Sequence, residues 1–407
     1  MPTKIDITND LRPAYYDDFH CLAAGCRYSC CKGWQITFNK KDYLSLKRQE
    51  GSEEFNRRMD RGLRRIRKGN LVGIHFGEFN MDGGACPLLR EDCLCDLQVE
   101  KGHGALPAVC QDFPRNKSYL ASGYLERSLS PACNGVLSLL WDLPEGIGFR
   151  SDPLPKEGQK ALTIHDGQPL AVFFGPIREW CVDMLQDRRY PLNQRILLMG
   201  MALQGLKDGE EDVAAWLLHA KNLQDSGDAG DAGVLEESKT ALSMFLFNNL
   251  RTLQRLKPPG DDFKTIRNEI ETGLHVEIEA GTNRSVIPLA PYREARARYE
   301  EAFRDRDYFL ENLMVSLFFH LHLPILSSRE ELWKGYVNFC NLYSFYRFLA
   351  VMSCREGAAG DRAELFRLVV FASRSLIHNG TRQTALRDEF FQNDSATLAH
   401  MAILVGG

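Results

Sequence analysis

The sequence has no long hydrophobic run. Its most apolar stretch, residues 313–326, is broken by two histidines and a proline, so it is too short and too polar to span a bilayer. The first residues, MPTKIDITNDLRPAYYDDF, have neither the apolar region nor the small-residue cleavage site of a signal peptide. We therefore expect no membrane span and a location in the reducing cytoplasm.

The chain also lacks a charge excess and a nucleotide-binding fingerprint. Fifty Lys and Arg residues face 54 Asp and Glu residues, a net charge of -4, so no general basic field exists for nucleic acid and no such partner is expected. The glycine-bearing stretches MDGGAC and KGHGALP lack the ordered spacing of the strand-to-helix glycine motif and are typical of turns. A conventional doubly wound cofactor site is therefore not predicted.

Cysteine, by contrast, is abundant and unevenly distributed. In a reducing compartment, clustered thiols are more often metal-binding or catalytic than paired in disulfides. Three of the twelve, Cys181, Cys340 and Cys354, are scattered, and we expect them to be small buried hydrophobes. The other nine fall in the first third of the chain: Cys21, Cys26, Cys30, Cys31, Cys86, Cys93, Cys95, Cys110 and Cys133.

The spacing of these cysteines favours an iron–sulfur cluster over zinc. Structural zinc sites use matched pairs of C-x2–4-C knuckles, whereas this chain has C-x4-C-x3-C-C from Cys21 to Cys31. Neighbouring cysteines such as Cys30 and Cys31 fit one tetrahedral ion poorly, but they can serve different atoms of a cluster. Zinc remains the alternative.

The hydrophobic pattern predicts a mainly α fold, in which an irregular, cysteine-rich, metal-binding N-terminal module (residues 1–143) packs on an α-helical C-terminal domain (residues 160–407). The turn-rich stretch 143–159 marks the boundary. Strand signals are few, with SVIPLA as one short candidate. Stretch 225–238 is expected to be a loop. Helical faces are predicted at two places: Ile177, Trp180, Cys181, Met184 and Leu185; and Trp333, Tyr336, Val337, Cys340 and Tyr343.

Four stretches, CLAAGCRYSCCKGW, CPLLREDCLCDL, CQDFPR and ERSLSPACNG, resemble in letters, order and separation the flagellin lysine-N-methylase family, whose cysteine module is shared with putative zinc- or iron-chelating proteins. REWCVDMLQDRRYPLNQRILLMG and SRSLIHNGTRQTALRDEFF match it more loosely. The resemblance implies S-adenosylmethionine-dependent methylation of flagellin lysines and a [4Fe-4S] cluster. It leaves Cys93 as an extra residue and implies these ligands: Cys21, Cys26, Cys30, Cys31, Cys86, Cys95, Cys110 and Cys133.

Methyl transfer to lysine requires a neutral amine, although free lysine has a pKa of about 10.4, so the site must desolvate the amine or supply a base. Asp112, Tyr119 and Tyr124 lie near the cysteines in sequence and are candidate bases. Arg115 is a candidate for binding the cofactor, and His378 is expected to cap a helix or pack in the core.

Two questions stay open at this level. A cluster with three cysteine ligands could hold the methyl donor on its free iron, or a four-cysteine cluster could be purely structural; the usual radical triplet C-x3-C-x2-C is absent. The same cysteines would also suit a non-enzymatic assembly or chelating protein.

Overall fold

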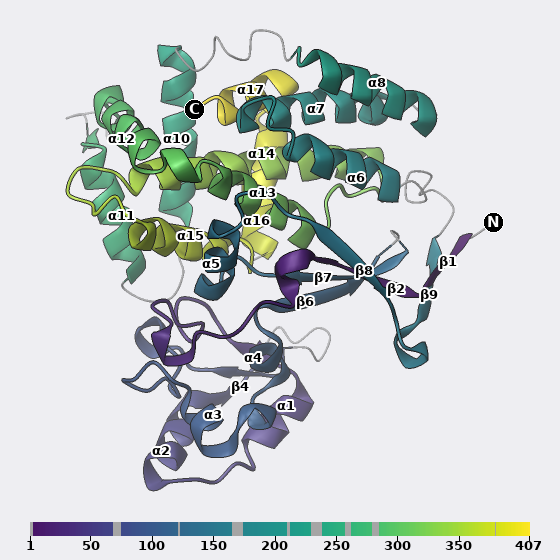
Figure 1. The fold of residues 1–407 in the computed structure, drawn as a ribbon. Helices are drawn as coiled ribbons and strands as arrows, with labels where there is room; N and C mark the ends of the chain where they lie inside the picture. The colour runs from purple at the N-terminus through teal and green to yellow at the C-terminus, as the bar shows by residue number, and fades with distance from the viewer. Residues whose placement is uncertain are drawn as a thin grey trace.

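The computed structural model describes residues 3–67, 75–120, 123–164, 174–209, 212–228, 238–256, 262–278, 285–378 and 380–407. A small N-terminal unit, residues 20–113, lies at one end of the molecule, and a larger helical body lies at the other (Figure 1). A four-stranded sheet lies between the two (Figure 1). The predicted mainly helical fold is confirmed, with strands added in the N-terminal part.

The central sheet has the strand order β6-β7-β2-β8. Its strands are β6 (Arg115–Tyr119), β7 (Tyr124–Leu129), β2 (Asn9–Pro13) and β8 (Phe149–Pro153). The β2–β7 pair is parallel, and the other two pairs are antiparallel. Outside this sheet, β1 (Thr3–Ile7) pairs with β9 (Lys160–Ile164). The expectation of few strands was wrong, because these short strands carry mostly polar residues. The stretch predicted as a boundary contains β8.

The N-terminal unit has its own small core. Its elements are β3 (Thr37–Phe38), α1 (Lys40–Leu46), α2 (Glu53–Gly62), β4 (Leu63–Arg65), β5 (Gly77–Phe79), α3 (Asp96–Lys101) and α4 (Ala108–Asp112). Phe38, Phe55 and Phe79 are buried at its centre, next to Cys86. Cys31, Cys95 and Cys110 pack against the same core. Four of the predicted thiol ligands therefore converge on one hydrophobic cluster.

The helical body is built around α14 (Arg329–Met352), which is buried on nearly all sides. Ser328 caps this helix by accepting a hydrogen bond from Glu331 N–H at 3.1 Å. The following helices pack on α14 or on helices that neighbour it: α5 (Asn134–Trp141), α6 (Phe174–Leu185), α7 (Leu192–Asp208), α8 (Val213–Ser226), α10 (Lys239–Arg255), α11 (Asp262–Gly273), α12 (Leu289–Ala302), α13 (Tyr308–His320), α15 (Arg362–Leu376), α16 (Gly380–Gln392) and α17 (Leu398–Val405).

The sequence predicted the core faces of two of these helices. All five predicted positions of α6 and all five of α14 are buried, and so are Cys181, Cys340 and Cys354, as expected for small core residues. The predicted loop at 225–238 is largely outside the described residues. A two-stranded ribbon, β10 (Glu277–Ile278) with β11 (Ser285–Val286), includes part of the SVIPLA stretch. In the described part of the chain, no helix has the length and hydropathy needed to cross a membrane.

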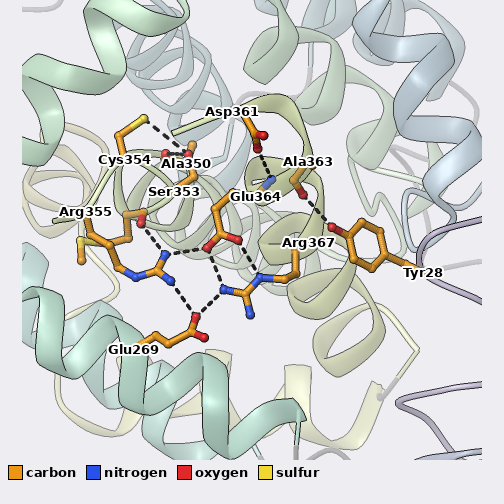
Figure 2. A network of polar contacts seen from close by, with 11 residues as sticks. Tyr28, Glu269, Ala350, Ser353, Cys354, Arg355, Asp361, Ala363, Glu364 and Arg367 are labelled. Carbon is orange, nitrogen blue, oxygen red and sulfur yellow. Dashed lines mark hydrogen bonds and ion pairs between the residues drawn. The ribbon is translucent and has the colours of Figure 1, made fainter. Parts of the chain in front are cut away.

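An ion-pair network at the start of α15 attaches the helical body to the first cysteine loop (Figure 2). Arg355 pairs with Glu269 of α11 and with Glu364 of α15, both at 2.6 Å. Arg367 contacts the same two carboxylates. The hydroxyl of Tyr28, between Cys26 and Cys30, donates a hydrogen bond of 2.8 Å to the carbonyl of Ala363 (Figure 2). The first turn of α15 thereby fixes the position of the cysteine loop.

Candidate functional site

A cavity of about 700 Å³ lies between the N-terminal unit and the helical body. One wall carries the thiols of Cys30, Cys31, Cys86, Cys95 and Cys110. The rest of the lining comes partly from the sheet and from the helical body, and it includes Ser130, His320, Arg374, His378 and Arg382. A cavity of this size, with polar groups converging from several elements, is typical of a site that binds a cofactor or a substrate group.

Short backbone contacts bring the thiol wall together. The N–H of Cys86 donates to the carbonyl of Cys31 at 2.8 Å, which places these two segments side by side. Leu89 and Cys95 form an isolated bridge, so the chain from Cys86 to Cys95 folds back on itself. Cys95 is the residue that precedes α3, and Cys110 lies within α4. Turns and very short helices thus bring cysteines that are far apart in sequence close together in space.

Cys93 occupies the tip of this turn. It has a positive φ of 64°, unusual for a residue with a side chain, and it is not among the residues that line the cavity. Its exclusion from the ligand set stays a prediction.

A second group of thiols lies beyond Cys30. Burial raises the pKa of the Cys133 thiol to about 11, and charge on Cys26 and Cys30 also raises it. Burial raises the pKa of Cys26, and negative charge on Cys30 and Cys21 also raises it. Cys21, Cys26 and Cys133 do not line the cavity. Cys30 is therefore the thiol that links this group to the cavity wall.

The surroundings of Cys31 and Cys110, two of the cavity thiols, oppose loss of the thiol proton. Cys30 lowers the pKa of Cys31 by hydrogen bonding, but Cys86 and burial outweigh this and raise it to about 12. Burial raises the pKa of Cys110 well above the usual value, and charge on Cys31 and Cys30 adds to it. Such thiols become thiolates when a bound cation replaces their protons.

The structure places no single-ion site at these residues. Within the described ranges, no three His, Cys, Asp or Glu side chains gather closely enough to hold a metal ion. The donor set is nevertheless chemically suited to a cluster, since thiolates are the usual ligands of iron–sulfur centres. Each cysteine ligand of a [4Fe-4S] cluster binds a different iron atom, so the sulfurs surround a volume rather than converge on one point.

The sheet wall presents a row of polar side chains to the helices. Alternate residues of β7 and its extension point to the same side. Glu126 pairs with the buried Arg178 at 2.8 Å, Ser128 contacts His320 Nδ1 at 2.9 Å, and Ser130 contacts His378 Nε2 at 2.8 Å. The two histidines are thereby fixed at the cavity by hydroxyl groups.

Both histidines are neutral at physiological pH. Burial lowers the pKa of His320 to about 3, and positive charge on His378 and His322 contributes. Burial and the guanidinium of Arg374 lower the pKa of His378 to about 4, although part of its ring is exposed within the cavity. Neutral imidazoles can accept a proton or a hydrogen bond from an ammonium group without repelling it.

The predicted candidates divide into two sets. Asp112 and Arg115 line the cavity, and Arg115 donates to the carbonyl of Phe19 at 3.1 Å. Tyr119 and Tyr124 are not lining residues, and the Tyr119 hydroxyl donates to Gly158 O at 3.0 Å. Sequence reasoning assigned no site role to His320, His378 or Arg374. Their only signal was the serine alternation in ERSLS and the polar residues in SRSLIHNG.

Fold and site together define a mainly helical protein with a thiol-lined cavity at its junction with a small N-terminal unit. The pattern of the FliB lysine N-methylase C-terminal domain matches residues 178–404, which is more than half of the chain. The chain therefore belongs to the FliB lysine N-methylase family. The matched segment runs from α6 to α17 and so includes Arg374 and His378 on the cavity wall.

Individual relatives agree with this assignment. The chain is similar to a lysine-N-methylase of Salmonella choleraesuis, with 31% identity over 172 residues, covering 37% of this chain and 40% of the relative. A lysine-N-methylase of Salmonella typhimurium gives the same values. The flagellar biosynthetic protein FliU of Salmonella muenchen is 33% identical over 147 residues, 34% of this chain and 79% of FliU. The chain thus spans about 40% of the length of the lysine-N-methylases it matches. No solved structure is significantly similar.

Proposed function

We propose that the protein is an S-adenosylmethionine-dependent protein-lysine N-methyltransferase that acts on flagellin and carries an iron–sulfur cluster on its N-terminal cysteines. Membership of the lysine N-methylase family supports the reaction, and the name of the relative FliU supports a flagellar substrate. The observation that carries the proposal is the cavity, whose lining combines the thiols of the N-terminal unit with the imidazoles of His320 and His378.

The chain's own residues would meet the requirements of the reaction as follows. Enclosure between two walls removes water from the lysine amine, which favours its neutral form. His378, held by Ser130 and exposed within the cavity, is a proton acceptor alongside the predicted candidate Asp112. The guanidinium groups of Arg115 and Arg382 would bind a carboxylate such as that of the methyl donor.

The cluster would be held by the predicted ligands on the cavity wall, Cys30, Cys31, Cys86, Cys95 and Cys110, or by these together with Cys21, Cys26 and Cys133. When bound, it would supply either an open iron for the donor's amino and carboxylate groups or a structural link between loops. The clustering of thiols in the sequence supports the proposed reducing, cytoplasmic location.

The deciding experiment uses protein purified without oxygen, flagellin and methyl-deuterated S-adenosylmethionine. Deuterated methyl groups on flagellin lysines, found by peptide mass spectrometry, are expected only when all three components are present. Iron and acid-labile sulfide are measured on the same sample. Iron-loaded protein that transfers no methyl group would instead support the alternative, a non-enzymatic chelating or assembly protein. Colourless, iron-free protein with full activity would remove the cluster from the proposal.

A further inference from the structure

Arg374, near the end of α15, is a buried cation without a carboxylate partner. Four arginines are buried among the described residues: Arg178, Arg195, Arg355 and Arg374. Each of the first three pairs with glutamate, namely Glu126, Glu311, and Glu364 with Glu269. In the described part of the chain, Arg374 pairs with no acid. Burying an unbalanced charge is costly, so an anion is expected beside it.

The guanidinium of Arg374 is fixed by three backbone carbonyls from cysteine-bearing loops. It donates to Tyr28 O at 2.7 Å, to Lys32 O at 2.9 Å and to Ala132 O at 3.3 Å. Each acceptor is a near neighbour of predicted ligands in sequence. Gly33, with φ of 82°, forms the turn that presents the Lys32 carbonyl. One side chain therefore joins the loop 26–33 to the loop before Cys133.

The groups that surround Arg374 and can carry negative charge are thiols. Arg374 lines the cavity together with Cys30 and Cys31. Its carbonyl acceptors lie next to, or two residues from, Cys26, Cys30, Cys31 and Cys133 in sequence. These four belong to both thiol groups, so Arg374 lies between the cavity wall and the second group. A thiolate-ligated centre is an anion of the kind that this cation requires.

We propose that Arg374 is a positioning residue of the thiol site: its guanidinium ties together the cysteine loops by their carbonyls and supplies the positive charge that balances an anionic, thiolate-ligated cluster. The inference rests on the proposed function, because it assumes that a cluster is present. It adds that the family-matched helical domain contributes a residue to the cluster environment, although all the ligands come from the N-terminal part.

The test compares wild type with Arg374→Gln and Arg374→Lys, all purified without oxygen. Reduction adds negative charge to a cluster, so loss of the nearby cation in Arg374→Gln is expected to shift its midpoint potential to a more negative value. Arg374→Lys keeps the charge and should keep the potential near that of wild type. An ammonium group cannot bond three fixed carbonyls as a guanidinium does, so both variants should lose iron severalfold faster to a chelator.

Arg355→Lys is the matched control, because Arg355 is equally buried but pairs with carboxylates instead of thiols. It should lower the melting temperature without changing the potential. Wild-type potential and chelator resistance in Arg374→Gln would overturn the inference. If Arg374→Gln does not fold, unchanged iron loss in Arg374→Lys would overturn it. Wild-type protein without iron would overturn the proposed cluster itself, and with it this role of Arg374.

Discussion

The Nε2 atom of His378 lies 2.8 Å from the hydroxyl oxygen of Ser130, although 248 residues separate them in sequence. His320 and Ser128 repeat the same arrangement at 2.9 Å across 192 residues. The strand β7 and its extension therefore hold both imidazoles of the cavity, and four expected outcomes depend on this arrangement and on the thiols that face it.

Replacing His378 by Asn is expected to reduce kcat for methyl transfer by about 100-fold or more, the usual range for removal of a general base. Ser130→Ala should cause a smaller loss, because the imidazole stays but is no longer held by a hydroxyl group. Single-turnover rates at saturating donor measure both effects. His275→Asn, at an exposed histidine that does not line the cavity, is the control. Equal rates for wild type and His378→Asn would rule out His378 as proton acceptor.

Acidification should destabilise the protein through His320. Its pKa is lowered to about 3 in the folded state, whereas an unfolded histidine titrates near 6.5, so the unfolded state binds more protons below that value. The stabilisation is complete above pH 6.5 and is lost as the pH falls toward 3, at up to about 1.4 kcal/mol per pH unit. His378 adds a smaller contribution, because part of its ring is exposed.

Urea unfolding between pH 7 and pH 5, where most carboxylates stay ionised, measures this slope. His320→Gln should reduce this slope by the equivalent of nearly one proton taken up on unfolding, whatever the substitution does to stability at neutral pH. A slope unchanged by that substitution would show that His320 is not buried in its neutral form.

The ion pair between Glu126 and Arg178 should contribute strongly to the junction of sheet and helices. Both side chains are almost completely buried, and Glu126 also faces His322 Nδ1 at 3.5 Å. Arg178→Met leaves a buried carboxylate without its cation and is expected to cost about 3–5 kcal/mol of unfolding free energy. Glu300→Gln, which removes an exposed pair with Arg296, should cost less than about 1 kcal/mol. Similar losses in both variants would contradict this assignment.

Substitution of single cysteines should separate ligands from packing residues. Cys95→Ser and Cys110→Ser, on the cavity wall, are expected to lose most of the iron and the thiolate-to-metal absorption. Cys93→Ser, at the turn tip, should retain both, since its side chain does not line the cavity. Cys340→Ser should retain iron but melt at a lower temperature, because it puts a hydroxyl into the core. Full iron content in Cys110→Ser would exclude it as a ligand.

The sequence was informative where the signal is local. The faces of α6 and α14 follow from helical periodicity, and Cys181 and Cys340 follow from the same stripes. The grouping of thiols was visible from their density. Helical faces and clustered thiols can be recognised from one short segment, because the signal needs no contact with a distant part of the chain.

The sheet and the second wall of the cavity depend on contacts over long distances in sequence. The strand β2, NDLRP, reads as polar, and it becomes a strand because β7 and β8 pair with both of its edges. His378 resembled a capping or core residue because its partner, Ser130, lies just after β7, 248 residues away in sequence. The role of Arg374 was equally hidden, since its acceptors are carbonyl groups that carry no side-chain signature.

Because α15 lies near the C-terminal end of the chain, its residues are synthesised long after the N-terminal cysteines. Trp34, from the first cysteine loop, packs edge-on against His378 with ring centroids 4.4 Å apart, so residues from both ends of the chain close the same cavity. While the ribosome is still making the earlier helices, the thiols have left it but Arg374 and His378 have not. If the proposed cluster is present, the closed site that would receive iron and sulfide forms only when translation is nearly finished, and a nascent chain stalled before α15 would display its thiols unprotected.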